Sequence, residues 1–257
     1  MENVEKIFLD HLSSIQKIES DTLNVPAVEI IPLLKKNYLP MIFIPNGEFI
    51  MGNNDGNDDE FPAHPVHIMR SFYMSAWPIT QEQWEIIMGQ NPSRFVGEKH
   101  PVENISWEEA NLFIDKLNKM LTVDGFRLPT EAEWEYSCRA GSKASYCFGN
   151  DINLLKDYAW YYDNSNGHPQ TVGQLKPNAW GVHDMHGNVW EWCDDWYGEY
   201  PSDLMIDPNG PLTGTNKVSR GGSWLNYARS CQAGYRSYYS PQNRGNGIGF
   251  RIVRSFE

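Results

Sequence analysis

The chain has 257 residues and a formal net charge of −12, because 33 Asp and Glu outnumber 21 Lys and Arg. This balance argues against nucleic acid as the main partner, since binding phosphate groups needs a surplus of Lys and Arg. Hydrophobic residues make up 40% of the chain and aromatic residues 13%, which supports a large core and excludes a disordered polypeptide. We therefore expect one folded domain or at most two.

Neither a membrane span nor a disulfide framework is expected. No stretch approaches the roughly 20 apolar residues that a membrane helix needs. Residues 1–12 are acidic and lack the basic start and the small-residue cleavage site of a leader. The four cysteines match no zinc-binding spacing, and we expect most of them to be small buried side chains. They are Cys138, Cys147, Cys193 and Cys231.

Residues 1–40 are predicted to form an N-terminal helical extension. Apolar residues and one histidine recur there at the spacing of an amphipathic helix. They are Val4, Ile7, Phe8, His11, Leu12, Ile15 and Ile18. Three prolines, at 26, 32 and 40, interrupt a second apolar run. We expect the extension to dock on a main domain formed by residues 41–257; an interaction segment is the alternative.

From residue 41 the pattern changes to short strands, tight turns and isolated helices. Residues 41–51 predict two strands around a hairpin turn at the Asn-Gly pair 46–47. After Gly141 the chain is rich in Gly, Asn, Tyr and Trp and has few periodic runs. Short strands are expected at 42–44 and 249–253. The expected fold class is therefore α+β, with few short strands and helices and much irregular structure.

Three helix starts are predicted from capping boxes. In each, a Ser or Thr is followed three residues later by Glu or Gln, so that each of the two side chains can accept a hydrogen bond from a free backbone N–H. The three N-cap residues are Thr80, Ser106 and Thr130. Gly141 is expected to follow the end of the third helix, where glycine tolerates the left-handed conformation.

Seven motifs follow one another between residues 41 and 253. They are IPxGxFxMG at 44–52, PVH at 65–67, PVxNISW at 101–107, RLPTEAEWE at 127–135, GNVWEW at 187–192, RGGSW at 220–224 and IGFR at 248–251. In this order they resemble the formylglycine-generating enzyme, or sulfatase-modifying factor, family. The resemblance implies that family's variant of the C-type lectin fold.

The resemblance does not extend to the catalytic thiols. Enzymes of this family use two cysteines shortly after the Gly-Gly-Ser motif to bind copper and oxidise a substrate cysteine. Asn226 stands at the first of these positions, and Cys231 alone cannot form a two-thiolate copper site. His183 and His186 could pair on a metal, but a hydrogen-bonded turn is the simpler interpretation. We therefore expect no enzymatic activity and no catalytic cofactor; a metal-dependent thiol oxidase or an accessory protein of the family is the alternative.

Residues 225–247 (the C-terminal window) differ in composition from the rest of the chain. Tyr, Ser, Gly and Asn fill 13 of these 23 positions, and no Asp, Glu or Lys is present. Antibody paratopes share this composition, because Tyr gives rigid contact area and the small residues give adaptable hydrogen bonding. The window resembles the variable region of proteins diversified by diversity-generating retroelements, which include C-type lectin-fold members from phage and Treponema.

This second resemblance implies which positions vary. Asparagine codons are randomised at adenine in such proteins, which makes Lys, Glu, Gln, Met and Trp unreachable. Twelve positions of the window would hold these codons, and none carries an unreachable residue: Leu225, Asn226, Tyr227, Ser230, Tyr235, Ser237, Tyr238, Tyr239, Ser240, Gly245, Asn246 and Gly247. The framework between and beside them is Trp224, Ala228, Arg229, Cys231, Gln232, Arg236, Pro241, Gln242, Asn243, Arg244 and residues 248–251.

The variable positions are expected to converge on one face, with Tyr235, Tyr238 and Tyr239 as contact anchors. Replacing Tyr238 and Tyr239 should therefore leave stability nearly unchanged. The resulting prediction is a monomeric, non-enzymatic protein that binds a varied protein or cell-surface ligand. Surface display suits such a binder, although neither the ligand nor the compartment follows from the sequence.

A structural calcium ion is also implied by the family resemblance. Position by position it would be held by the side chains of Asp184 and Glu191 and the carbonyls of Gly187 and Val189. Two carboxylates and two carbonyls on one tight turn suit a hard cation. The alternative is that the two carboxylates only accept hydrogen bonds from turn amides. The acidic segment 55–60 is expected to be a solvated loop.

Overall fold

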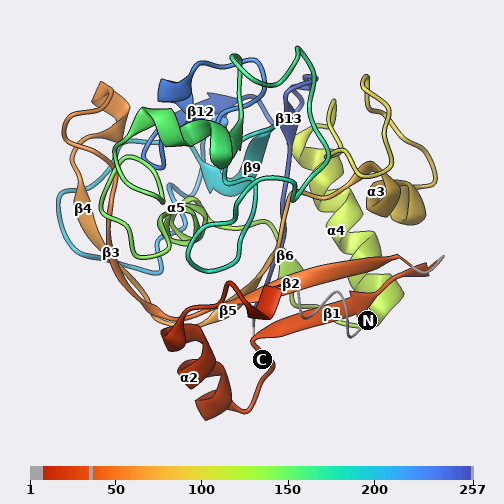
Figure 1. Ribbon diagram of the computed structural model, residues 1–257, viewed down its shortest axis with the longest axis horizontal. Coiled ribbons are helices and arrows are strands. Elements are labelled where there is room, and N and C mark those ends of the chain that lie inside the picture. The colour runs from red at the N-terminus through yellow and green to blue at the C-terminus, as the bar shows by residue number, and fades with distance from the viewer. Residues whose placement is uncertain (1–7, 35–36, 256–257) are drawn as a thin grey trace.

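Short strands form four small sheets in the computed structural model of the protein, which describes residues 8–34 and 37–255. The predicted α+β class is confirmed: short helices and short strands occur in separate runs along the chain, and long irregular segments join them (Figure 1). Within the described ranges, no helix combines the length and the apolar character needed to cross a bilayer.

The two larger sheets lie at opposite ends of the molecule (Figure 1). The first has the strand order β1-β2-β5-β14-β6, with β1 (Val28–Pro32), β2 (Tyr38–Ile44), β5 (Phe72–Ser75), β14 (Val253–Ser255) and β6 (Phe126–Arg127). The second has the order β12-β11-β9-β13, with β12 (Arg236–Tyr239), β11 (Lys217–Arg220), β9 (Trp190–Trp196) and β13 (Ile248–Gly249). The smaller sheets contain β10 (Met205–Ile206), β4 (His64–Ile68) and β3 (Gly47–Met51), and β7 (Ala159–Trp160) with β8 (His186–Gly187).

The three predicted capping boxes are present. They begin α3 (Gln81–Met88), α4 (Trp107–Leu121) and α5 (Glu131–Arg139), and in each the side chain of the third residue also accepts from the N-cap backbone. Helix α5 ends at a left-handed Ala140, directly before Gly141. Local hydrogen bonding alone determines these helix ends, and the sequence therefore predicts them well.

The N-terminal segment differs from the prediction. Helix α2 (Ser14–Leu23) begins at a capping box of its own, on Ser13, and buries Gln16. Ile15 and Ile18, predicted to face the core, are 61% and 67% exposed. The amide of Gln16 donates to the carbonyls of Phe43 and Trp180, and these bonds hold the polar face inward. Val4 and Ile7 lie outside the described residues.

The predicted domain boundary after residue 40 falls inside a strand. β1 pairs antiparallel with β2, with Val28 opposite Ile42, so residues 28–44 belong to the five-stranded sheet. The predicted hairpin at residues 46–47 is also wrong, because β2 pairs with β5 whereas β3 pairs with β4. Likewise the strand expected at 249–253 is divided between β13 and β14, which lie in different sheets.

Buried ion pairs fix α5 against the sheet that carries the C-terminal window. Arg220 on β11 is fully buried and pairs with Glu135 of α5. Arg236 on β12 donates to both carboxylate oxygens of Glu131, over 2.7 and 2.8 Å. Bidentate arginine–carboxylate pairs of this kind are geometrically specific. The acidic residues of the RLPTEAEWE motif therefore have a structural role.

Candidate ligand-binding face

The C-terminal window runs along the outer edge of the second sheet. It contains a 3-10 turn at Ala228–Cys231, then β12, then the turn that precedes β13. Among the described strands, β12 pairs only with β11. Figure 1 places β12 and β13 at the end of the molecule opposite β1 and β2.

Burial within the window largely follows the predicted division into variable and framework positions. Eleven of the twelve predicted variable residues are exposed or half-buried, and Gly247 is the exception. Among the framework residues the buried ones are Trp224, Ala228, Cys231, Arg236 and Pro241 together with residues 248–251. Arg229, Gln232, Gln242, Asn243 and Arg244 are framework residues that reach solvent.

The two ends of the window meet. The indole of Trp224 donates to the carbonyl of Asn246 over 2.9 Å. A Cβ added to Gly247 would lie 3.3 Å from Cδ1 of Leu225. A side chain at position 247 would need small shifts of Leu225 and of Ser223, whose Oγ would lie 3.2 Å away, so the residues at positions 225 and 247 are sterically coupled. Residues 225–226 and 245–246 form one continuous part of the surface, and Gly247 beside them is buried.

The tyrosines of β12 do not share a face, contrary to the prediction. Successive strand residues point to opposite sides of a sheet. Tyr239 is partly buried against the core, with its ring centroid 6.1 Å from that of Trp192. Tyr235 also packs on the core, 6.0 Å from Trp190. Tyr238 points the other way and is 47% exposed.

Two aromatic residues outside the window extend this surface. The ring of Tyr162 lies 4.7 Å from that of Tyr227, which is 65% exposed. The ring of Tyr197, at the end of β9, lies 4.1 Å from that of Tyr238. Sequence reasoning missed both residues, because neither lies in the compositionally unusual segment. The candidate ligand-binding face therefore consists of the exposed window residues together with Tyr162 and Tyr197.

Asn226 stands where the family resemblance would place the first catalytic cysteine, and its side-chain amide is hydrogen-bonded. The hydroxyl of Ser223 donates to Oδ1 of Asn226 over 2.6 Å. Cys231 is fully buried, and burial raises the pKa of its thiol to about 12. A thiol with such a pKa is protonated at neutral pH, whereas the thiolate is the nucleophile and metal ligand.

The histidines at 183 and 186 are each held by a different carbonyl. Nδ1 of His183 lies 2.9 Å from the carbonyl oxygen of Leu175, and Nδ1 of His186 lies 2.7 Å from that of Cys231. Burial lowers the pKa of both imidazoles to about 4. Across the described ranges, no group of three or more His, Cys, Asp or Glu side chains is arranged to hold a metal ion.

The predicted calcium ligands fit an ion only in part. Asp184 is buried; its Oδ2 accepts from the backbone of Gly173 over 2.7 Å, and its Oδ1 has no hydrogen-bond partner. Burial raises the pKa of Asp184 to about 6. Glu191 is already neutralised, because both of its carboxylate oxygens accept from Arg251, over 2.6 and 2.8 Å. Only Asp184 thus offers a free carboxylate oxygen, and calcium binding stays a prediction.

Comparison with known proteins places this geometry in a family. Residues 29–256 match the family described as sulfatase-modifying factor enzyme 1-like domain. The chain is 30% identical to chaperone protein LppX of Paenibacillus barcinonensis, over 73% of this chain and 81% of that protein. It is 34% identical to the formylglycine-generating enzyme of Streptomyces coelicolor, over 60% of this chain and 52% of the enzyme. It therefore spans about half of that enzyme.

Two solved structures share the fold over most of their length. Treponema denticola variable protein 1 matches with a TM-score of 0.85 and 31% identity, covering 90% of this chain and 100% of that one. PvdO from Pseudomonas aeruginosa matches with a TM-score of 0.77 and 27% identity, covering 89% and 98%. The chain thus belongs to the sulfatase-modifying factor enzyme 1-like family, has its C-type lectin-like fold, and resembles a variable protein of this family in structure.

Proposed function

We propose that the protein is a non-enzymatic binder whose C-terminal window is diversified by a retroelement to recognise varied ligands. The observation that carries this proposal is the distribution of burial within the window. Residues at the predicted variable positions reach solvent at all but one site, whereas Trp224, Arg236 and Cys231 between and beside them are buried. The structural similarity to Treponema denticola variable protein 1 supports the same function.

The fold can tolerate substitution at these positions because its stability lies elsewhere. Arg236 is held by Glu131, and Trp224 by the backbone of Asn246. Neither contact uses a variable side chain. Surface substitutions away from packing typically change stability by less than ~0.5 kcal/mol. Most variable residues can then change together while the buried framework keeps the sheet and its turns in place.

The exposed tyrosines suit a protein or cell-surface ligand. The rings of Tyr227 and Tyr238 each contact, at a tilt, a tyrosine outside the window, which restricts their rotamers before a ligand arrives. Rigid aromatic contacts are typical of binding hot spots, because little conformational entropy is lost on binding. We propose that the protein acts as a monomer and that these tyrosine pairs are the anchors of the face.

Sequencing the 3′ end of the gene and its flanking DNA in many independent isolates tests this proposal. We expect substitutions to be confined to the twelve variable positions, beside a near-copy template with asparagine codons there. Invariant codons in every isolate, with no template nearby, would overturn the proposal.

A second candidate follows from the identity to formylglycine-generating enzymes. In that case the chain would oxidise a substrate cysteine with copper and oxygen. The buried, protonated thiol of Cys231 and the amide at Asn226 speak against it. Oxygen consumption by the copper-supplemented protein on a cysteine-containing peptide, lost in Cys231→Ser, would establish this activity instead.

A further inference from the structure

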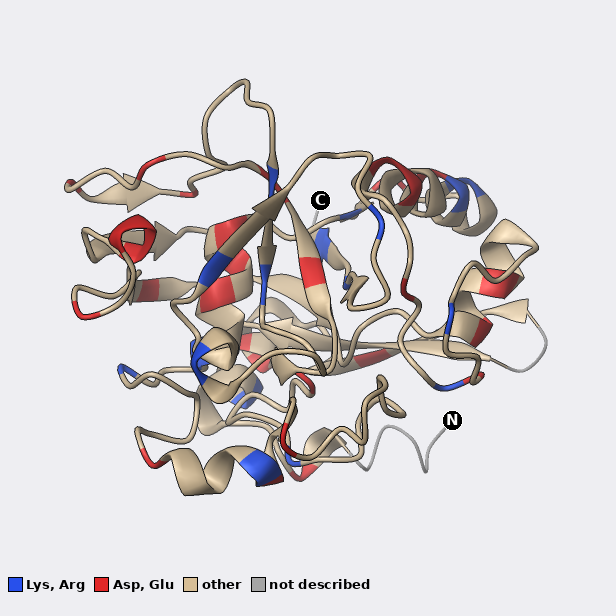
Figure 2. Cartoon of the chain, turned by 90° about the horizontal axis from the view of Figure 1, so that it is seen from above, with Lys and Arg blue, Asp and Glu red and all other residues tan. Residues whose placement is uncertain are grey.

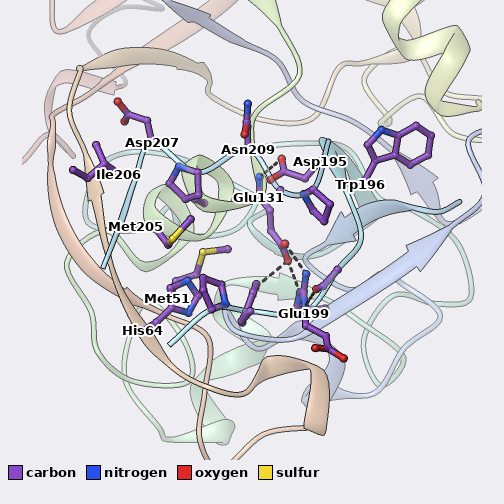
Figure 3. A pocket seen from close by; sticks show the side chains of 18 residues that line it. Met51, His64, Glu131, Asp195, Trp196, Glu199, Met205, Ile206, Asp207 and Asn209 are labelled. Carbon is purple, nitrogen blue, oxygen red and sulfur yellow. Dashed lines mark hydrogen bonds and ion pairs between the residues drawn. The ribbon is translucent and has the colours of Figure 1, made fainter. Parts of the chain in front are cut away.

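A cavity of about 290 Å³ lies beside the Tyr238 side of the candidate ligand-binding face. It opens to solvent and is lined by residues of β4, the end of β9, the first turn of α5 and the segment 198–211, which contains β10 (Figure 3). The side chains of Met51, Met205, Pro201 and Pro211 give it apolar walls. The wall at residues 198–200 continues directly from Tyr197, whose ring contacts that of Tyr238.

Carboxylates dominate the polar part of this cavity. Glu131, Asp195, Glu199 and Asp207 line it, and Arg236 is the only Lys or Arg among the lining residues that the structure describes. The guanidinium of Arg236 is already committed to Glu131 and to the carbonyls of Asp59 and Gly198. The remaining carboxylates therefore have no Lys or Arg to pair with among the described lining residues. The imidazole of His64 also lines the cavity, and its Nδ1 lies 3.0 Å from the carbonyl oxygen of Pro62. Asp and Glu residues (red) occur on many elements of the molecule, as Figure 2 shows from above.

Asp195 is the buried one of the three carboxylates that Arg236 does not pair with. It is 4% exposed, and its Oδ2 accepts from the backbone N–H of Glu131 over 2.8 Å. None of the described residues donates a hydrogen bond to its Oδ1. Burial, and the nearby charge of Glu131, raise the pKa of Asp195 well above its usual range. A buried carboxylate of this kind is stabilised in its charged form by an incoming cation.

Cations outside the cavity do not neutralise Asp195 directly. The ammonium of Lys217 donates to the carbonyl of Asp194 and lies 3.9 Å from the ring centroid of Trp196. Arg127 is bound in bidentate fashion by Glu133. Lys217 and Arg127 therefore act on Asp195 only by electrostatic attraction at a distance, without a direct ion pair.

We propose that this cavity binds a primary alkylammonium group, with Asp195 facing the ammonium and the methionines and prolines contacting the aliphatic chain. Asp195 offers a single free oxygen, which suits the point charge of an ammonium. A guanidinium prefers a carboxylate with both oxygens free. The ammonium could come from a free amine or from a lysine side chain of a bound protein. The cavity lies outside the variable positions, so the proposal is independent of their diversification.

Titration calorimetry on the full chain with three probes of equal length tests the proposal. Hexylammonium, 1-hexanol and hexanoate share the aliphatic chain and differ in charge. We expect hexylammonium to bind about tenfold to hundredfold more tightly than hexanol, because a charged hydrogen bond contributes roughly 1.5–3 kcal/mol. Hexanoate should not bind measurably. Equal affinity for hexylammonium and hexanol would overturn the proposal.

Charge-matched variants locate the site. Asp195→Asn keeps the shape and can still accept from Glu131, so it should lose the preference for hexylammonium and keep the weak binding of hexanol. Glu199→Gln, at the exposed rim, should reduce the preference and serves if Asp195→Asn fails to fold. Glu85→Gln, an exposed acid on α3, is the control and should change nothing. Undiminished preference in both cavity variants would overturn the proposal.

Two further probes distinguish the sources of the ammonium. N-acetyl-lysine-N-methylamide carries the same group on a peptide backbone. Binding of this compound and of hexylammonium would assign the cavity to a lysine side chain of a partner. Binding of hexylammonium alone would assign it to a free amine. Both results support a cation site, whereas no binding of either compound contradicts it.

Discussion

Adjacent tyrosines of β12 should contribute very differently to stability. Tyr238 and Tyr239 are both predicted variable positions, but they lie on opposite sides of the strand. Tyr238 is half-exposed and contacts Tyr197, whereas Tyr239 packs beside Trp192 on the core. We therefore replace each by alanine in turn and compare the free energies of unfolding.

The magnitudes follow from these contacts. Removing Tyr238 loses one aromatic contact at the surface, where about half of the side chain is already in water, and this should cost about 0.5–1.5 kcal/mol. Removing Tyr239 also opens a space against the core. Truncating a fully buried aromatic residue costs about 3–5 kcal/mol, and for a partly buried one we expect about 2–3 kcal/mol. The difference between the two variants should thus exceed about 1 kcal/mol.

Urea unfolding followed by tryptophan fluorescence measures this difference. Tyr227→Ala serves as a second exposed control and should resemble Tyr238→Ala. A double-mutant cycle between Tyr197 and Tyr238 should give a coupling energy of about 0.5–1.5 kcal/mol. Equal destabilisation by Tyr238→Ala and Tyr239→Ala would refute the assignment of the two side chains to opposite faces.

Three further predictions concern buried charges. Arg236→Ala should lower the free energy of unfolding by about 3–5 kcal/mol in urea titrations, because Glu131 would be left buried and unpaired. The control Arg244→Ala breaks an exposed pair with Glu109 and should cost less than about 1 kcal/mol. Similar losses in the two variants would contradict a structural role for the Arg236–Glu131 pair. Since the pKa of Asp195 is raised in the folded protein, the stability linked to its proton is complete below its unfolded pKa and is lost as pH rises through its folded pKa. Asp195→Asn should therefore gain stability over the original protein with rising pH in unfolding curves, and a relative loss would argue against the burial of a proton there. Calcium should raise the melting temperature of the protein but not that of Asp184→Asn; an equal rise in both would exclude Asp184 as a ligand.

Local features of the fold could be predicted from the sequence. The helix starts at Thr80, Ser106 and Thr130 depend on hydrogen bonds within four residues, so the residues that form them can be read directly from the sequence. The composition of the window likewise indicates an adaptable contact surface. The order of the seven motifs indicates the family, because their spacing along the chain is visible without a structure.

Features that depend on distant partners could not be predicted. The Asn-Gly pair at 46–47 favours a hairpin locally, but β5 and β4 supply the partners of β2 and β3 from later in the chain. The sequence suggests Glu191 as an oxygen ligand for calcium, but in the folded protein its carboxylate pairs with the buried guanidinium of Arg251. The pairing of these groups is decided by tertiary contacts, which local spacing does not encode.

The sequence alone thus determined the family, the helix starts and the segment in which contact residues would lie. Only the tertiary structure decided which window tyrosines are exposed, because β12 points Tyr238 and Tyr239 to opposite sides. The tertiary structure alone also brought Tyr197 to Tyr238 and placed Asp195 of β9 at the start of α5, where it lines the cavity. The physical reason is that burial depends on packing between elements far apart in the chain, whereas capping and composition are local.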